Sequence, residues 1–63
     1  MVHIKEAMEL AIDEELKAAE RYRNMARDAV DPETRLLMEQ LAREEDMHYH
    51  KLSERLKAIR LMG

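Results

Sequence analysis

Val30-Asp31-Pro32-Glu33-Thr34 is the only clear interruption in a chain of 63 residues, and it therefore determines where the helices begin and end. Asp31 can accept hydrogen bonds from free amides at the start of a helix, and Pro32 suits the first helical position, where its missing N–H costs nothing. Proline also disfavours the α conformation at the preceding residue, so the helix before it must stop. The stretch predicts two helices, over about residues 4–29 and 32–60, joined by a very short turn. Such a connection makes them antiparallel neighbours in a helical hairpin.

The composition favours long helices in one small domain over residues 1–63. Charged residues make up 40% of the chain and aromatic residues 3%, with one glycine and one proline. Strands and turns would need more aromatic, β-branched and glycine residues. A domain of this size buries only about 60% of its unfolded surface and is marginal without disulfides, metal or association. Because the chain has no cysteine, disulfides, thiolate metal sites and iron–sulfur clusters are excluded. We therefore expect metal, partner chains or both.

The charge pattern argues against nucleic acid and membrane partners. The net charge is −3, with acidic and basic residues interspersed, so there is no basic footprint for nucleic acid or anionic lipid. The apolar runs are too short for a membrane span or a signal peptide. We expect a soluble, cytoplasmic protein.

Each predicted helix carries an apolar stripe at alternating steps of four and three residues, the spacing of a packing seam. The first stripe consists of Ile4, Met8, Ala11, Glu15, Ala18, Tyr22, Met25 and Ala29. The second consists of Met38, Leu41, Glu45, His48, Leu52, Arg55 and Ile59, and the apolar faces are widened by Ile12, Leu16, Ala19, Ala26, Leu37 and Leu56. A single hairpin cannot cover two such broad faces. We therefore expect an all-α hairpin that dimerises into a four-helix bundle.

Three ionisable residues, Glu15, Glu45 and His48, stand in these stripes where apolar residues are expected. A buried unpaired carboxylate costs several kcal/mol, so each needs water, a counter-charge or a metal. Counted from the turn in an antiparallel hairpin, the three residues lie at one level, about 20 Å away at 1.5 Å per residue. Two hairpins related by a two-fold axis would supply four Glu and two His, which is the ligand set of a dinuclear carboxylate centre. Such ligands suit iron or manganese, and zinc is also plausible. The plainer interpretation is a buried Glu15–His48 hydrogen bond that fixes the register.

Two segments resemble the rubrerythrin and ferritin-like superfamily. IDEELKAAERY (residues 12–22) looks like its first ligand helix, where a metal-binding Glu precedes a Tyr by seven, here Glu15 and Tyr22. AREEDMHYH (residues 42–50) looks like the following Glu-x-x-His helix. The chain is especially similar to the encapsulated ferritins in the spacing between the two motifs, in having only two helices and in its tight turn.

The resemblance implies that Glu15, Glu45 and His48 are the iron ligands and the catalytic residues of a di-iron ferroxidase centre formed across a homodimer. Encapsulated ferritins assemble further into a decameric ring inside an encapsulin shell, so the resemblance implies these partners and an encapsulin compartment as well. The hydroxyl of Tyr22, and less strongly the extra carboxylate of Glu44, would orient the ligands.

The function that the sequence favours is oxidation of Fe(II) by O₂ or H₂O₂, with open coordination positions for the oxidant. Two alternatives remain open. One is a non-enzymatic helical hairpin that only homo-oligomerises, and the other is a di-manganese or di-iron peroxidase with the same ligands.

Overall fold

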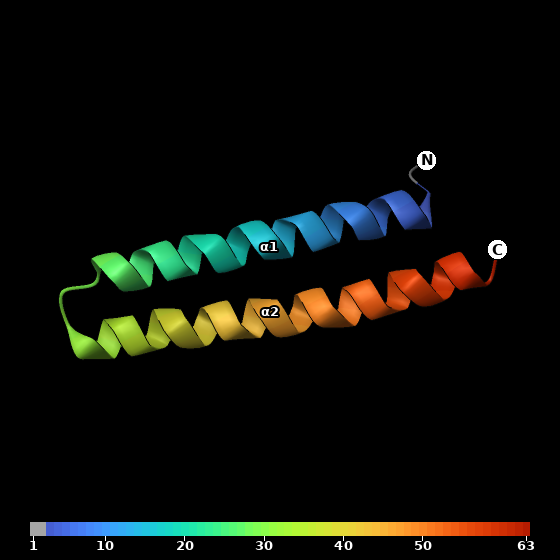
Figure 1. Cartoon of the computed structure of the whole chain (residues 1–63). Coiled ribbons are helices and arrows are strands. Elements are labelled where there is room, and N and C mark those ends of the chain that lie inside the picture. Colours follow the sequence, from blue (N-terminus) through green and yellow to red (C-terminus); the bar gives the residue numbers. More distant parts are fainter. Residues whose placement is uncertain (1–2) are drawn as a thin grey trace.

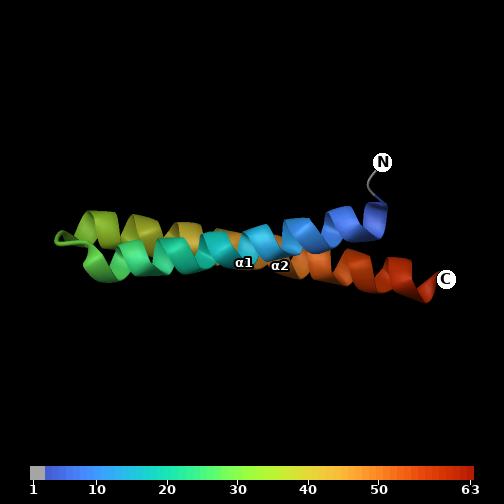
Figure 2. The ribbon, with the colours of Figure 1, turned by 90° about the horizontal axis from the view of Figure 1, so that it is seen from above.

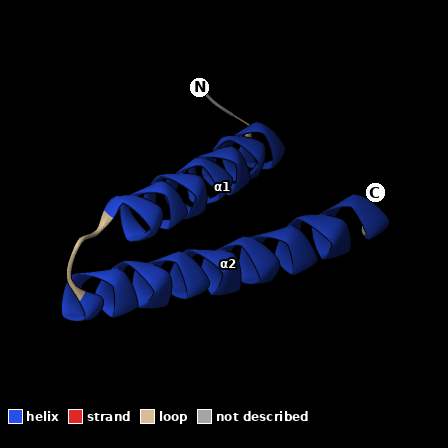
Figure 3. Cartoon of the chain, turned by 60° about the vertical axis from the view of Figure 1, so that its left-hand side comes forward, coloured by secondary structure: helices blue, strands red, loops and turns tan. Residues whose placement is uncertain are grey.

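A computed structural model of the chain describes residues 3–63, which form two antiparallel helices (Figure 1). Helix α1 spans Ile4–Asp28 and helix α2 spans Pro32–Leu61. The predicted hairpin is confirmed, and the observed helix ends differ by one residue from the predicted ends at 29 and 60. Ala29 is extended, with φ −67° and ψ 130°, so α1 ends before it. Figure 3 shows that one short loop is the only non-helical connection between the two helices.

The turn is held by the residues that the sequence singled out. The side chain of Asp31 accepts a hydrogen bond from the backbone amide of Thr34 at 2.9 Å, and Pro32 occupies the first turn of α2. An N-cap of this kind satisfies one of the free amides at the start of a helix. A second hydrogen bond holds the turn, in which Arg35 Nη2 donates to the carbonyl oxygen of Ala29 at 3.1 Å. Helix α2 therefore starts at a defined residue and is tied back to the end of α1.

The hairpin is long and thin, with principal extents of 49 × 20 × 12 Å. Seen from above, the two helices cross at a shallow angle, and the start of α1 and the end of α2 lie opposite the turn (Figure 2). Neither described helix contains a stretch both long and apolar enough to cross a membrane. Because the hairpin is only two helices thick, most side chains of a single chain lie on its surface.

Small residues form the contact between the helices. Among the described residues, those that are buried are Ala19, Ala26, Ala42 and Leu56, each with at most 6% of its surface exposed. Alanines let the two backbones approach closely, and Leu56, at 4% exposed, is the one large side chain among the buried residues of the described chain. The predicted stripes lie beside this contact rather than at its centre. Their residues, such as Tyr22 and Leu41, are only partly covered.

Two ion pairs connect the helices on their exposed surfaces. Arg23 pairs with Asp46 in the middle of the hairpin, and Arg60 Nη2 lies 2.8 Å from Glu9 Oε1 near the open end. Exposed pairs of this kind add little stability, but they favour one register of the two helices over others.

A single chain leaves many large apolar side chains in solvent. The described residues include ten large apolar side chains that are exposed, among them Met25 at 47% and Leu37 at 49%. The predicted dimer would cover part of this surface, and it stays a prediction for the described single chain.

Candidate metal centre

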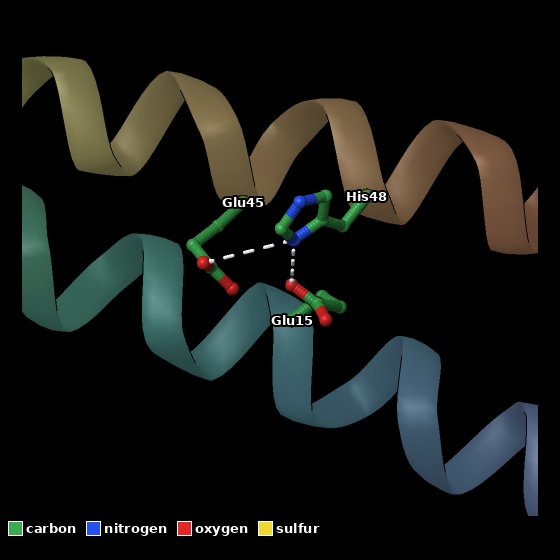
Figure 4. Close-up of side chains that lie close together, drawn as sticks. All are labelled: Glu15, Glu45 and His48. Atoms are coloured by element: carbon green, nitrogen blue, oxygen red, sulfur yellow. Dashed lines mark hydrogen bonds and ion pairs between the residues drawn. The ribbon is translucent and has the colours of Figure 1, made fainter.

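Three side chains from the two helices meet near the middle of the hairpin. Glu15 comes from α1, whereas Glu45 and His48 come from successive turns of α2 on the same face. Figure 4 shows all three pointing toward one another across the gap between the helices. The sequence argument from equal heights along an antiparallel hairpin therefore placed these side chains correctly.

The imidazole of His48 lies between the two carboxylates. Its Nδ1 is 3.2 Å from Glu15 Oε2 and 3.7 Å from Glu45 Oε1 (Figure 4). One ligand atom from each residue can be chosen so that all three lie within 4.8 Å of one another. This is the one group of three or more His, Cys, Asp or Glu within residues 3–63 that meets such a requirement.

The two carboxylates are the more sheltered members of the cluster. The side chains of Glu15 and Glu45 are 23% and 21% exposed, whereas that of His48 is 52% exposed. The pKa of Glu45 is raised, first because its carboxyl group shares a hydrogen bond with that of Glu15, and then because of burial and repulsion from Glu15. His48 opposes this rise in pKa, and the nearby Glu44 adds slightly to it. The crowding of the two carboxylates thus disfavours the charged form of Glu45, and a bound cation would offset that effect.

The three residues fit a metal ion of the type that the sequence predicted. Two ligands of one ion, each about 2.2 Å from it, are at most about 4.4 Å apart, so small side-chain movements would close the cluster. Carboxylate oxygen and imidazole nitrogen suit iron, manganese or zinc. No Lys or Arg of the described chain forms an ion pair with Glu15 or Glu45, so a bound cation would not have to displace one. The arrangement offers three ligands per chain, which leaves coordination positions open.

Among the described residues, neither of the two residues predicted to support the ligands forms a hydrogen bond with them. Tyr22 is half-buried on the same stripe as Glu15, and its hydroxyl forms no hydrogen bond to the cluster within the described chain. Glu44 is exposed and accepts a hydrogen bond from Gln40 Nε2 at 3.4 Å. Its influence on the cluster is the electrostatic one noted above. The supporting roles of Tyr22 and Glu44 stay predictions.

Comparison with known families agrees with this geometry. The sequence model of the family described as Rubrerythrin matches residues 2–61, nearly the whole chain. The chain belongs to the rubrerythrin family. This family is part of the ferritin-like di-iron superfamily, so membership implies a di-iron site, and the Glu/His cluster supplies ligands of the required kind. No curated protein matches the chain significantly, and no solved structure does either. The rubrerythrin family is therefore established, and the encapsulated ferritin subtype stays a prediction.

Proposed function

We propose that two copies of this rubrerythrin-family chain pair to build a di-iron centre that oxidises Fe(II) with O₂ or H₂O₂. The observation that carries the proposal is the convergence of Glu15, Glu45 and His48 within a family whose members hold two irons. Each chain would supply two carboxylates and one imidazole. Two chains would then supply four carboxylates, whose charge balances two divalent cations.

The need for two chains follows from ligand number and exposure. Three ligands from one hairpin are too few for two ions, and a two-fold axis beside the cluster would double them. The half-exposed ring of His48 marks the flank that the partner would cover. Exposed Met25 and Leu37 lie on the same flank by helical periodicity, so pairing there would also remove apolar surface from water. Metal binding and association would thus stabilise each other.

In this proposal the protein's residues bind, neutralise and position the ions. Glu45 and His48 would hold one ion per chain, because they lie three residues apart on one helix face. Glu15 would bridge the pair or complete the coordination from the opposite helix. A bound cation would favour the charged carboxylate of Glu45 and so counteract the crowding with Glu15 that raises the pKa of Glu45.

Fe(II) is the substrate of the proposed reaction. Two Fe(II) ions each lose one electron, and O₂ takes up both electrons and two protons to become H₂O₂. Placing the two ions side by side lets both electrons leave together, which avoids release of a one-electron radical. The carboxylates favour the product, because hard oxygen ligands stabilise the higher charge of Fe(III).

The test is the rate of Fe(III) formation when Fe(II) is added to the protein in air, followed by ferric absorbance. We expect the Glu45→Ala and Glu45→Gln variants to lose the protein-dependent rate. Glu54→Gln is the matched control, since Glu54 is an exposed carboxylate elsewhere on α2. Equal rates for wild type and both Glu45 variants would disprove the ferroxidase proposal. The peroxidase alternative is tested with the same variants in a second assay, in which the protein is loaded with Mn(II) and given H₂O₂ and a peroxidase substrate in place of Fe(II) and air.

The 3.2 Å contact between His48 Nδ1 and Glu15 Oε2 favours a second candidate, a non-enzymatic homodimerisation hairpin whose register this hydrogen bond fixes. Under that function the dimer would form equally well with a chelator present. Sedimentation velocity with and without metal separates the two candidates, and it also tests whether larger rings of the encapsulated ferritin type form.

A further inference from the structure

A groove lies between the helices near the turn, away from the proposed metal centre. It has a volume of about 620 Å³. Two of the buried alanines, Ala26 and Ala42, line it, and their small side chains leave it hollow. The other lining residues are four arginines and one glutamate: Arg23, Arg27, Arg35, Arg43 and Glu39. Such a concentration of arginine stands out in a chain whose net charge is −3.

Three of these arginines have no carboxylate partner within the described residues. Arg27 donates to the amide oxygen of Asn24, and Arg35 donates to the backbone carbonyl of Ala29 at 3.1 Å. Both acceptors are neutral. No carboxylate oxygen of residues 3–63 forms an ion pair with Arg27, Arg35 or Arg43, whereas Arg23 is paired with Asp46. The groove therefore carries positive charge that the described chain does not neutralise.

Helical geometry separates the groove from the metal centre. Arg23 lies about 80° round α1 from Glu15, and Arg35 lies about 80° round α2 from Glu45 in the same sense. His48 lies about 60° round α2 from Glu45 in the opposite sense. The arginines and the half-exposed imidazole thus lie on opposite flanks of the hairpin. A partner chain docked over His48 would leave the groove open.

We propose that this arginine groove binds an anion that carries two or more phosphate groups. Guanidinium groups recognise phosphate oxygens through paired, charge-assisted hydrogen bonds, and arginine is the residue best suited to this. Arg35 and Arg43 are eight residues apart on α2, which is about 12 Å along the helix axis. A chain of phosphates can contact both ends of this row without either arginine side chain bending toward the other. The volume also suits a ligand larger than a single phosphate.

Glu39 is the one lining group that opposes an anion. It lies four residues from both Arg35 and Arg43 on α2, so it faces the same groove. It forms no ion pair with either arginine in the described chain. Neutralising it should therefore strengthen anion binding, an effect opposite in sign to that of removing an arginine.

The test is titration of the full chain with tripolyphosphate at low ionic strength, followed by calorimetry, with orthophosphate and adenosine triphosphate as further ligands. We expect the double variant Arg27→Gln/Arg43→Gln to weaken tripolyphosphate binding at least about tenfold, as loss of two charge-assisted contacts implies. Glu39→Gln should tighten it. Arg21→Gln is the matched control, because Arg21 is exposed on α1 outside the groove and should leave binding unchanged. Added salt should weaken binding to the wild type more than to the double variant.

Three results would overturn the proposal. They are no binding of tripolyphosphate, equal affinity of the double variant and the wild type for tripolyphosphate, and tighter binding of a polyglutamate peptide than of tripolyphosphate. The last result would assign the groove to an acidic protein segment. Circular dichroism of each variant checks that it remains folded, and the chosen arginines are exposed, so their loss leaves the core intact. Tighter binding of adenosine triphosphate than of tripolyphosphate would identify nucleotides as the source of the phosphates, and the reverse would identify inorganic polyphosphate. Because the Glu45 variants leave the groove untouched, this proposal and the ferroxidase proposal can fail separately.

Discussion

Metal binding should stabilise the fold strongly, and the Glu45→Gln variant should lose that effect. The three proposed ligand residues come from two helices, and Glu15 is separated from Glu45 by 30 positions in sequence. The unfolded chain does not hold them together, so a metal would bind the folded chain preferentially. Glutamine keeps the shape of glutamate but lacks the negative charge that attracts a cation.

The size of the effect follows from linkage. A ligand that binds only the folded state stabilises it by about 2.7 kcal/mol at a free concentration one hundred times its Kd. Each kcal/mol raises the Tm of a domain of this size by about 4–8 °C. Zn(II) or Mn(II), which do not oxidise in air under these conditions, should therefore raise the wild-type Tm by roughly 10–20 °C.

Thermal unfolding followed by far-UV circular dichroism, with and without metal, measures this shift. We expect Glu45→Gln to show little or no metal-dependent shift, and the Glu54→Gln control to shift like the wild type. Without metal, Glu45→Gln should be at least as stable as the wild type, since it removes the crowding of two carboxyl groups that raises the pKa of Glu45. A full metal shift in Glu45→Gln would refute the assignment of Glu45 as a ligand. A large loss of stability without metal would instead show that Glu45 is a structural hydrogen-bonding residue.

Three further predictions concern the metal-free chain. The first concerns Glu45, whose raised pKa means that the folded chain binds its proton more tightly than the unfolded chain does. The free energy of unfolding should therefore fall as the pH rises above 4.5, the ordinary pKa, through the raised pKa. Urea unfolding at several pH values measures this dependence, which should be absent in Glu45→Gln. Leu56→Ala should cost about 2–5 kcal/mol because Leu56 is only 4% exposed, a loss comparable with the whole stability of so small a domain, and an unchanged urea midpoint would contradict the assigned core. Asp31→Ala should lower the Tm by removing the acceptor for the Thr34 amide, whereas Asp31→Asn keeps that acceptor. The pKa of Asp31 is lowered by this hydrogen bond, so its stabilising effect should fade as pH falls below the ordinary value of 3.8, in the wild type but not in Asp31→Asn.

The hairpin was predictable because its signals are local. Asp31 and Pro32 act within one turn of α2, and the N-cap contact to Thr34 formed as expected. The equal heights of Glu15, Glu45 and His48 depend only on the rise of a helix and the length of the turn. Both quantities follow from the sequence once the turn is placed, so the cluster could be located before the structure was known.

The sequence alone does not show whether an apolar stripe packs against the other helix of the same hairpin or against a second hairpin. The apolar stripe through Tyr22 and Leu41 follows the spacing of a packing seam, yet the buried contact runs through small residues beside it. Ala42 is among the most enclosed residues, but alanine is so common in helices that it gave no signal. A stripe at seam spacing indicates that something packs there, and it does not identify which helix does. In the proposed dimer, a second chain would cover the half-buried stripe that carries the three proposed ligand residues.

The arginine groove escaped sequence analysis for a related reason. Arg27 and Arg43 each look like ordinary surface residues of a charged helix, because opposite charges lie nearby in the sequence. Only the crossing of the helices brings them to one groove, and within residues 3–63 neither arginine forms an ion pair with a carboxylate that is near it in sequence.

We propose above that two chains share two ions through Glu15, Glu45 and His48. Native mass spectrometry of the chain loaded anaerobically with Fe(II) can test this sharing in one step, because one spectrum counts both chains and ions. We expect a species with two chains and two irons that disappears in Glu45→Gln. A dimer of the same abundance that carries no iron, or a monomer that binds iron by itself, would contradict it.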